Sequence, residues 1–156
     1  MGILMDLVAG DERDILLALA IEDMTAFDDR ERFTAHLALG DALDLAWLDE
    51  FSAAVRDATG GASPVDFVDA RAAVPRRAAT ERVVERVDPA WVAAVADATD
   101  EQLDLVLERW APRLEEAGVV PLTDAGRTAV GDLTAQLVAF CRAATEARTV
   151  IFAWGL

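Results

Sequence analysis

The residues of this chain that could do chemistry are few, and their spacing favours none of the common catalytic arrangements. His36 is the only histidine and Cys141 the only cysteine among 156 residues. A histidine-based metal site would need carboxylates to complete it, and only Asp29, seven residues before His36, could share a helical face with it. Cys141 lies on the apolar side of a predicted helix, so we expect a buried and unreactive thiol.

Serine, lysine and carboxylate chemistry are also poorly supported. Ser52 falls in a predicted helix and Ser63 in a Gly-Ala-Ser-Pro stretch, and neither has the spacing of a nucleophile elbow. The absence of lysine excludes a lysine Schiff base and a Walker-type phosphate loop. Adjacent carboxylates could support acid–base catalysis if burial raised the pKa of one of them, but chance produces such pairs among 29 acidic residues. We therefore predict no catalytic residue, no cofactor and no metal. The carboxylate pairs are Asp28 with Asp29, Asp66 with Asp69, and Asp100 with Asp104.

The charge of the chain is strongly negative and unevenly distributed. Its 29 acidic residues and 14 arginines give a formal net charge of −15. Residues 1–50 carry 13 acids and 3 arginines, whereas residues 51–86 carry 5 acids and 6 arginines. Such a chain is a poor ligand for nucleic acid or an anionic membrane surface, and a basic protein partner would be attracted to it. The simpler interpretation is that the acidity keeps an alanine-rich surface soluble.

Length and composition predict one domain over residues 1–156. The chain contains no run of 18 apolar residues, so we expect no membrane-spanning helix. Residues 1–10 lack the basic segment with which a signal peptide begins. A single cysteine fits a reducing cytoplasm. We therefore expect a cytoplasmic protein, as a monomer or a homodimer.

The elements that must position any site begin with two apolar strands at the ends of the chain, Ile3–Val8 and Thr149–Trp154. We expect them to lie in one small sheet, with closely spaced termini, packed against four to five helices in an α+β fold.

Trp47, Trp91 and Trp110 fall in helical apolar stripes and are predicted core residues, whereas Trp154 is a candidate interface residue. The expected helices cover residues 11–21, residues 41–59 with Asp41 as N-cap, a segment that starts at Asp88-Pro89, a segment that starts with the capping box Thr99–Gln102, and a long segment that starts at Thr123. Pro112 predicts a kink or a helix end near Trp110–Ala111.

Three stretches are less regular. Arg32–Leu39 fits either a strand or a lead-in to the next helix, and the β-branched Arg82–Val87 segment favours a strand. Residues 60–80 lack a periodic stripe and are predicted to form a flexible surface loop. The arginines of this loop either fold back onto an acidic helix or bind an anion.

The order of these elements resembles the YfbM-like family of small bacterial proteins, a family without an assigned biochemical role. The resemblance rests on the Met1-Gly2-Ile3 opening, Leu43–Trp47, the turn Ala58-Thr59-Gly60, and the helical pair Pro89–Trp110 followed by a long helix and a terminal strand. It implies a single α+β domain and carries no catalytic residue over to this chain. Family members commonly place histidines just after the tryptophan, where this chain has Leu48 and Phe51.

The leading functional hypothesis is a non-enzymatic binding protein, of the immunity or antagonist type, that uses acidic residues to meet a basic partner. The candidate contacts are Asp28, Asp29, Glu31, Asp49 and Glu50. The alternative is a small enzyme or anionic small-molecule binder, with a pocket between the sheet and the helix at residues 41–59 and with Arg71, Arg76 and Arg77 as anion ligands. Self-association through a helix face or a strand edge could accompany either function.

Overall fold

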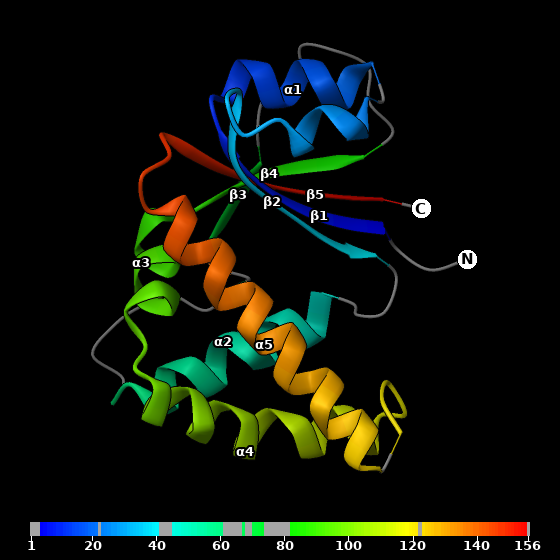
Figure 1. The fold of residues 1–156 in the computed structure, drawn as a ribbon, viewed down its shortest axis with the longest axis vertical. Coiled ribbons are helices and arrows are strands. Elements are labelled where there is room, and N and C mark those ends of the chain that lie inside the picture. Colours follow the sequence, from blue (N-terminus) through cyan, green and yellow to red (C-terminus); the bar gives the residue numbers. More distant parts are fainter. Residues whose placement is uncertain are drawn as a thin grey trace.

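The computed structural model describes residues 4–21, 23–40, 45–60, 67, 70–73, 82–121 and 123–155. Within these ranges, five strands form one antiparallel sheet and five α-helices accompany it, which confirms the predicted α+β fold (Figure 1). In chain order the elements are β1 (Leu4–Gly10), α1 (Glu12–Ala20), the 3-10 helix η1 (Met24–Asp28), β2 (Phe33–Gly40), α2 (Leu45–Ala58), β3 (Arg71–Ala73), β4 (Val83–Val87), α3 (Pro89–Asp97), α4 (Asp100–Glu116), α5 (Asp124–Ala144) and β5 (Thr149–Gly155).

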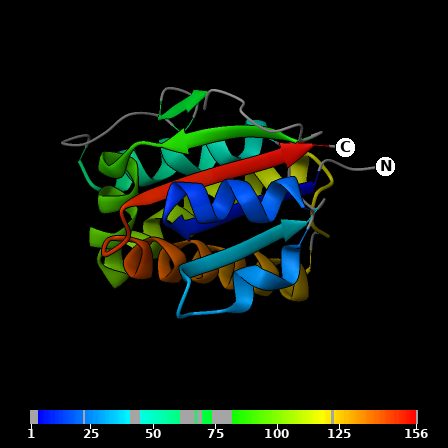
Figure 2. The same ribbon diagram turned by 90° about the horizontal axis from the view of Figure 1, so that it is seen from above.

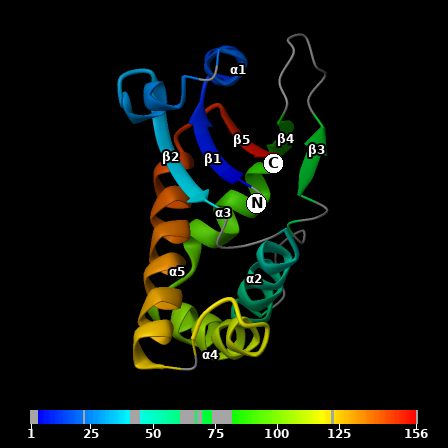
Figure 3. The same ribbon diagram turned by 90° about the vertical axis from the view of Figure 1, so that its right-hand side faces the viewer.

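The two terminal strands lie next to each other in the middle of the sheet. The strand order is β2-β1-β5-β4-β3, and β1 pairs with β5 from Leu4 opposite Gly155 to Gly10 opposite Thr149. The start of β1 and the end of β5 therefore lie side by side, as the sequence predicted (Figures 1 and 3).

Each face of the sheet is covered by a different layer. Helices α2–α5 lie on one face, and α1 with η1 lies on the other (Figures 1 and 3). Because both faces are covered, β5, and β1 apart from Asp6, have mostly apolar sequences rather than alternating patterns. The larger core contains Leu7, Phe51, Trp91, Trp110 and Phe152, and the smaller core contains Val8, Ile15, Phe27, Phe33 and Ile151.

Local capping interactions start three of the helices where the sequence predicted. The carboxylate of Asp88 accepts a hydrogen bond from the Ala90 N–H at 2.8 Å, one residue after Pro89. Thr99 and Gln102 form the reciprocal capping box at the start of α4. Thr123 accepts a hydrogen bond from the Gly126 N–H at 3.1 Å and starts α5. Each cap satisfies a backbone donor that has no partner inside the helix.

Of the kink or helix end predicted near Trp110–Ala111, the helix end is wrong, because α4 continues through Pro112 to Glu116, and the kink stays a prediction. A proline removes one hydrogen bond within the helix. Trp110 and Leu114, one turn apart on either side of it, are fully buried, and this packing holds the two parts of α4 in one helix.

The irregular stretches of the sequence contribute strands. Arg32–Leu39 corresponds to β2, and Arg82–Val87 to β4. The predicted loop of residues 60–80 contains β3, a three-residue edge strand that pairs with β4, while most of that stretch lies outside the described residues. The predicted N-cap Asp41 also lies outside them.

The tryptophans follow the prediction in part. Trp91 and Trp110 are fully buried, and Trp47 is half-buried against the larger core. Trp154 is also half-buried and donates its indole N–H to Glu85 at 2.6 Å, so it is a packed residue rather than a free surface aromatic. None of the helices that the structure describes is long and apolar enough to span a membrane.

Candidate functional site

The five acidic residues proposed to contact a partner do not form one surface. Asp28, Asp29 and Glu31 are exposed at the end of η1 and in the turn before β2. Asp49 and Glu50 lie on α2, on the other side of the sheet (Figure 3). Asp49 is half-buried, and Glu50 pairs with Arg113 of α4 at 3.4 Å. The structure therefore groups the first three acids and separates them from the other two.

The arginines proposed to bind an anion are represented by Arg71, because Arg76 and Arg77 lie outside the described residues. The Arg71 side chain is only 8% exposed. Its guanidinium carbon lies 4.9 Å from the centre of the Phe67 ring and 5.9 Å from that of Phe152, and its Nε donates to the Phe67 carbonyl at 3.1 Å. A carboxylate oxygen of Glu85 lies 3.9 Å away. Arg71 therefore packs against the core and interacts with Phe67 and Glu85, and its proposed role in binding an anion stays a prediction.

A cluster of three polar side chains, which the sequence did not reveal, lies on the sheet face under α1. Val8 of β1 pairs with His36 of β2, which places Asp6 and His36 on the same face, one diagonal step apart. Nε2 of His36 lies 2.9 Å from Oδ1 of Asp6, and Arg82 donates to Oδ2 of Asp6 at 2.7 Å. The only signal in the sequence is that Asp6 interrupts an otherwise apolar strand.

The electrostatics of this cluster favour an ionised Asp6. Burial raises the pKa of the Asp6 carboxyl, but the hydrogen bonds from His36 and Arg82 lower it by more, so its pKa lies below the ordinary value of 3.8. The second imidazole nitrogen, Nδ1, lies 3.9 Å from Asp28, which is 80% exposed. Asp6 thus holds the imidazole in place through Nε2, and the opposite nitrogen, Nδ1, faces Asp28 at the acidic end of η1.

In a catalytic triad, an aspartate orients the histidine that acts as the general base. In the described part of the chain, however, no hydroxyl or thiol forms a hydrogen bond with His36, and no group of three residues is arranged to hold a metal ion. The Cys141 thiol is buried, and burial raises its pKa above the ordinary value of 9.0. The cluster therefore links β1, β2 and the residue just before β4, and no nucleophile contacts His36 in the described ranges.

The outer surface of the α1 and η1 layer carries exposed apolar side chains. Leu17 and Ile21 are 56% and 63% exposed. Ile21 is the C-cap of α1, and its N–H donates to the Leu17 carbonyl at 3.1 Å, so the two side chains lie one helical turn apart on the same side of the helix. The backbone N–H of Asp23 bonds to the Ala18 carbonyl at 3.0 Å and brings the chain from α1 back toward η1. Figure 2 shows α1 lying over the strands with its outer face free of any other helix.

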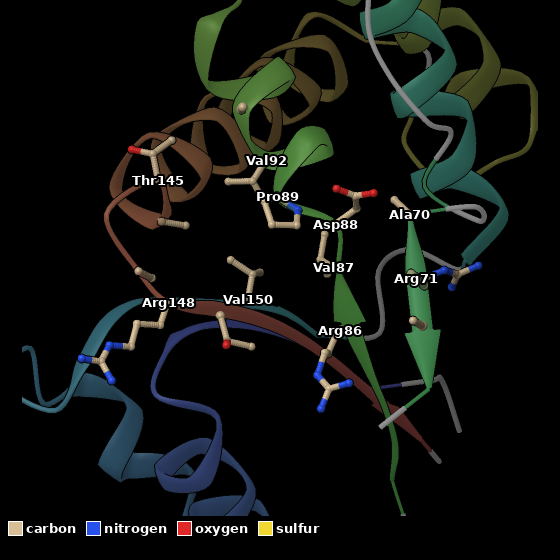
Figure 4. A pocket seen from close by; sticks show the side chains of 15 residues that line it. Ala70, Arg71, Arg86, Val87, Asp88, Pro89, Val92, Thr145, Arg148 and Val150 are labelled. Atoms are coloured by element: carbon tan, nitrogen blue, oxygen red, sulfur yellow. The ribbon is translucent and has the colours of Figure 1, made fainter. Parts of the chain in front are cut away.

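A cavity of about 550 Å³ lies at the end of the sheet where β5 begins and β4 ends (Figure 4). Residues of β3, of the start of α3 and of the end of α5 complete its lining. The alternative hypothesis placed a pocket against the helix at residues 41–59. No residue of α2 lines this cavity, so its position differs from the expected one. Among the described residues, its lining nevertheless includes three arginines, Arg71, Arg86 and Arg148, and one acidic residue, Asp88.

Comparisons with known proteins add no functional assignment. A scan against protein-family models and searches of curated proteins and of solved structures returned no match. The resemblance to the YfbM-like family therefore stays a prediction.

Proposed function

We propose that this protein binds a protein partner whose surface is basic and partly apolar, through the outer face of α1 and η1. The main support for this proposal is the exposed apolar pair Leu17 and Ile21. This pair lies in the same layer as the exposed acids Asp28, Asp29 and Glu31. Large apolar side chains at the centre of an interface contribute most of its affinity, and charges at its rim accelerate association and select the partner.

The charge of this layer supports a basic partner. Residues 11–32 contain eight acidic residues and three arginines. Two of these arginines are turned toward their own layer: Arg30 donates to the Phe27 carbonyl at 2.5 Å, and Arg32 lies over the Phe33 ring at 5.1 Å. Asp29 and Glu31 form no ion pair within the described residues, so their charges are available to a partner. An immunity or antagonist protein that covers a basic functional surface of its target would bind in this way.

The test begins with capture of partners from lysate on the wild-type protein and on a Leu17→Ser, Ile21→Ser variant. A Leu105→Ser variant is the matched control, because Leu105 is 45% exposed on α4, in the other layer. We expect a basic protein that the wild type and the control retain and the double variant loses. Binding of that purified protein should then weaken about tenfold or more between low salt and about 0.5 M NaCl, where screening acts within a few ångströms.

Three outcomes would contradict the proposal. The double variant could retain the same proteins as the wild type, the retained protein could be acidic, or its affinity could be unchanged by salt. Light scattering supplies a further decisive result. A homodimer of the purified chain that dissociates in the Leu17→Ser, Ile21→Ser variant would show that a second copy covers this face.

The contribution of the exposed acids Asp28, Asp29 and Glu31 can be tested separately with the same purified partner. Asp28→Asn with Asp29→Asn should lower the association rate about tenfold and leave the dissociation rate nearly unchanged. Asp104→Asn with Glu108→Gln removes the same charge from the exposed side of α4 and should change neither rate. Equal effects of the two pairs would mean that net charge, and not this surface, attracts the partner.

A further inference from the structure

The cavity of about 550 Å³ forms because β4 and β5 separate at one end of the sheet. Their pairing ends at Arg86 opposite Ile151, although β5 begins two residues earlier, at Thr149. β4 leaves the sheet through Asp88-Pro89 and continues as α3, and a proline has no N–H with which to continue a ladder. The gap that opens between the two strands is closed at the back by α3 and by the end of α5 (Figure 4).

The interior of the cavity is apolar. Val87, Val92 and Val150 line it and are buried in the protein, while Ala93 and Ala147 lie nearer to the solvent. The volume lies within the range of small-molecule sites, which are typically lined by apolar side chains with a few polar groups at defined positions. Such an interior favours an apolar ligand body of modest size, because the ligand and the valines both lose contact with water.

The mouth of the cavity is cationic, in a chain whose net charge is −15. Arg148 is exposed and forms no ion pair or side-chain hydrogen bond in the part of the chain that the structure describes. Arg86 is half-exposed and pairs with Glu12 through two contacts of 2.5 and 2.9 Å. The carboxylate of Asp88 is already engaged as the cap of α3. Figure 4 shows the side chains of Arg86 and Arg148 extending from the rim, away from the valines.

We propose that this cavity binds a small organic anion, a carboxylate or sulfonate attached to an apolar body. The apolar body lies against Val87, Val92 and Val150, and the acid group lies at the mouth, where the Arg148 guanidinium turns to meet it. A guanidinium without an ion pair can form two parallel hydrogen bonds to such a group. Inorganic phosphate is a poor ligand by this argument, because it would leave the apolar interior unfilled.

The test uses two fluorescent probes that differ in one charged group. The anion is 8-anilinonaphthalene-1-sulfonate, and the neutral probe is N-phenyl-1-naphthylamine, which lacks the sulfonate. We expect saturable binding of the anion, with an affinity about tenfold higher than that of the neutral probe. Decanoate should displace the anion, and inorganic phosphate should not. Because this probe also stains partly folded chains, methyl NMR shifts of Val87, Val92 and Val150 should locate the bound molecule in the cavity.

Matched variants separate the two parts of the site. Arg148→Glu should weaken binding of the anionic probe about tenfold or more and leave the neutral probe unaffected, whereas Arg109→Glu on α4 should change neither. Ala93→Phe should fill the cavity and abolish binding of both probes. Ala90→Phe, at an exposed position of the same helix outside the cavity lining, should not.

Several results would overturn the proposal. Absence of saturable binding would do so, as would equal affinity of the two probes or methyl shifts confined to other residues. Anion binding that survives both Arg148→Glu and Ala93→Phe would place the probe elsewhere on the protein.

Discussion

Nε2 of His36 lies 2.9 Å from Oδ1 of Asp6, although 30 positions separate the two residues in the chain. The contact is possible because β1 and β2 are antiparallel neighbours in the sheet. Arg82, just before β4, binds the other carboxylate oxygen at 2.7 Å. One buried carboxylate therefore joins three segments of the chain, and its protonation should affect the stability of the fold.

Asp6→Asn tests this relationship through pH. The folded-state pKa of Asp6 lies below its ordinary value of 3.8, so the ionised carboxylate stabilises the fold at pH values above 3.8. This contribution is lost as the pH falls through the folded-state pKa. We expect Asp6→Asn to lower the free energy of unfolding by about 2 kcal/mol at neutral pH, with a difference from the wild type that narrows in acid.

Urea unfolding followed by tryptophan fluorescence, from neutral pH to about pH 3, measures this difference. Asp104→Asn is the control, since Asp104 is exposed on α4 and its replacement should leave the curve of the wild type nearly unchanged. A stability difference between Asp6→Asn and the wild type that stays constant with pH would show that the Asp6 charge does not carry the effect.

Trp91→Phe should lower the free energy of unfolding by about 1 kcal/mol more than Trp110→Phe. Urea unfolding followed by far-UV circular dichroism measures this difference. Both indoles are fully buried and both contact Phe51. The Trp91 N–H donates to the Ser52 hydroxyl at 2.8 Å, whereas the Trp110 N–H has no hydrogen-bond partner within the described residues. In a Ser52→Ala background the two substitutions should cost nearly the same. A difference that persists there would trace to packing instead.

Gly126→Ala should lower the free energy of unfolding by about 1–3 kcal/mol, although alanine is the better helix former. A methyl group at this position would overlap the backbone carbonyl oxygen of Pro121, so the start of α5 would have to move. Gly131→Ala on the same helix meets nothing within 4 Å and should stabilise the protein by about 0.5–1 kcal/mol. Thermal or urea unfolding of the two variants should therefore give shifts of opposite sign. Shifts of the same sign would refute the predicted contact.

Cys141 should react slowly with iodoacetamide in the native protein and rapidly in guanidinium chloride. The side chain is fully buried in the larger core, and burial raises the pKa of the thiol, so little thiolate forms and the reagent has no access. Mass spectrometry of timed samples at about pH 8 measures the two rates. Rapid modification of the native protein, with its circular dichroism spectrum unchanged, would mean that α5 opens without global unfolding.

The sequence predicted the candidate binding surface less completely than it predicted the fold. The charge of the acidic region pointed to Asp28, Asp29 and Glu31, which the structure places together at the end of η1. The same criterion also selected Asp49 and Glu50, because linear charge density does not tell a solvent-facing acid from one between two helices. Leu17 and Ile21 were missed, since an exposed leucine and a core leucine look alike in a helical stripe.

Features that depend on neighbouring residues could be predicted from the sequence alone. Asp88-Pro89, Thr99–Gln102 and Thr123 start their helices because each capping side chain reaches a backbone amide only two or three residues away. Apolar composition likewise determined that the two terminal strands are buried.

Contacts between residues far apart in the chain could not be predicted in this way. The contact of Asp6 with His36 and Arg82, the packing of Arg71 on the Phe67 and Phe152 rings, and the cavity at the end of β4 all depend on strand register and on which layer covers each face of the sheet. The physical reason is that many weak contacts spread over the whole core determine the register and the layers, so no short segment of sequence contains that information.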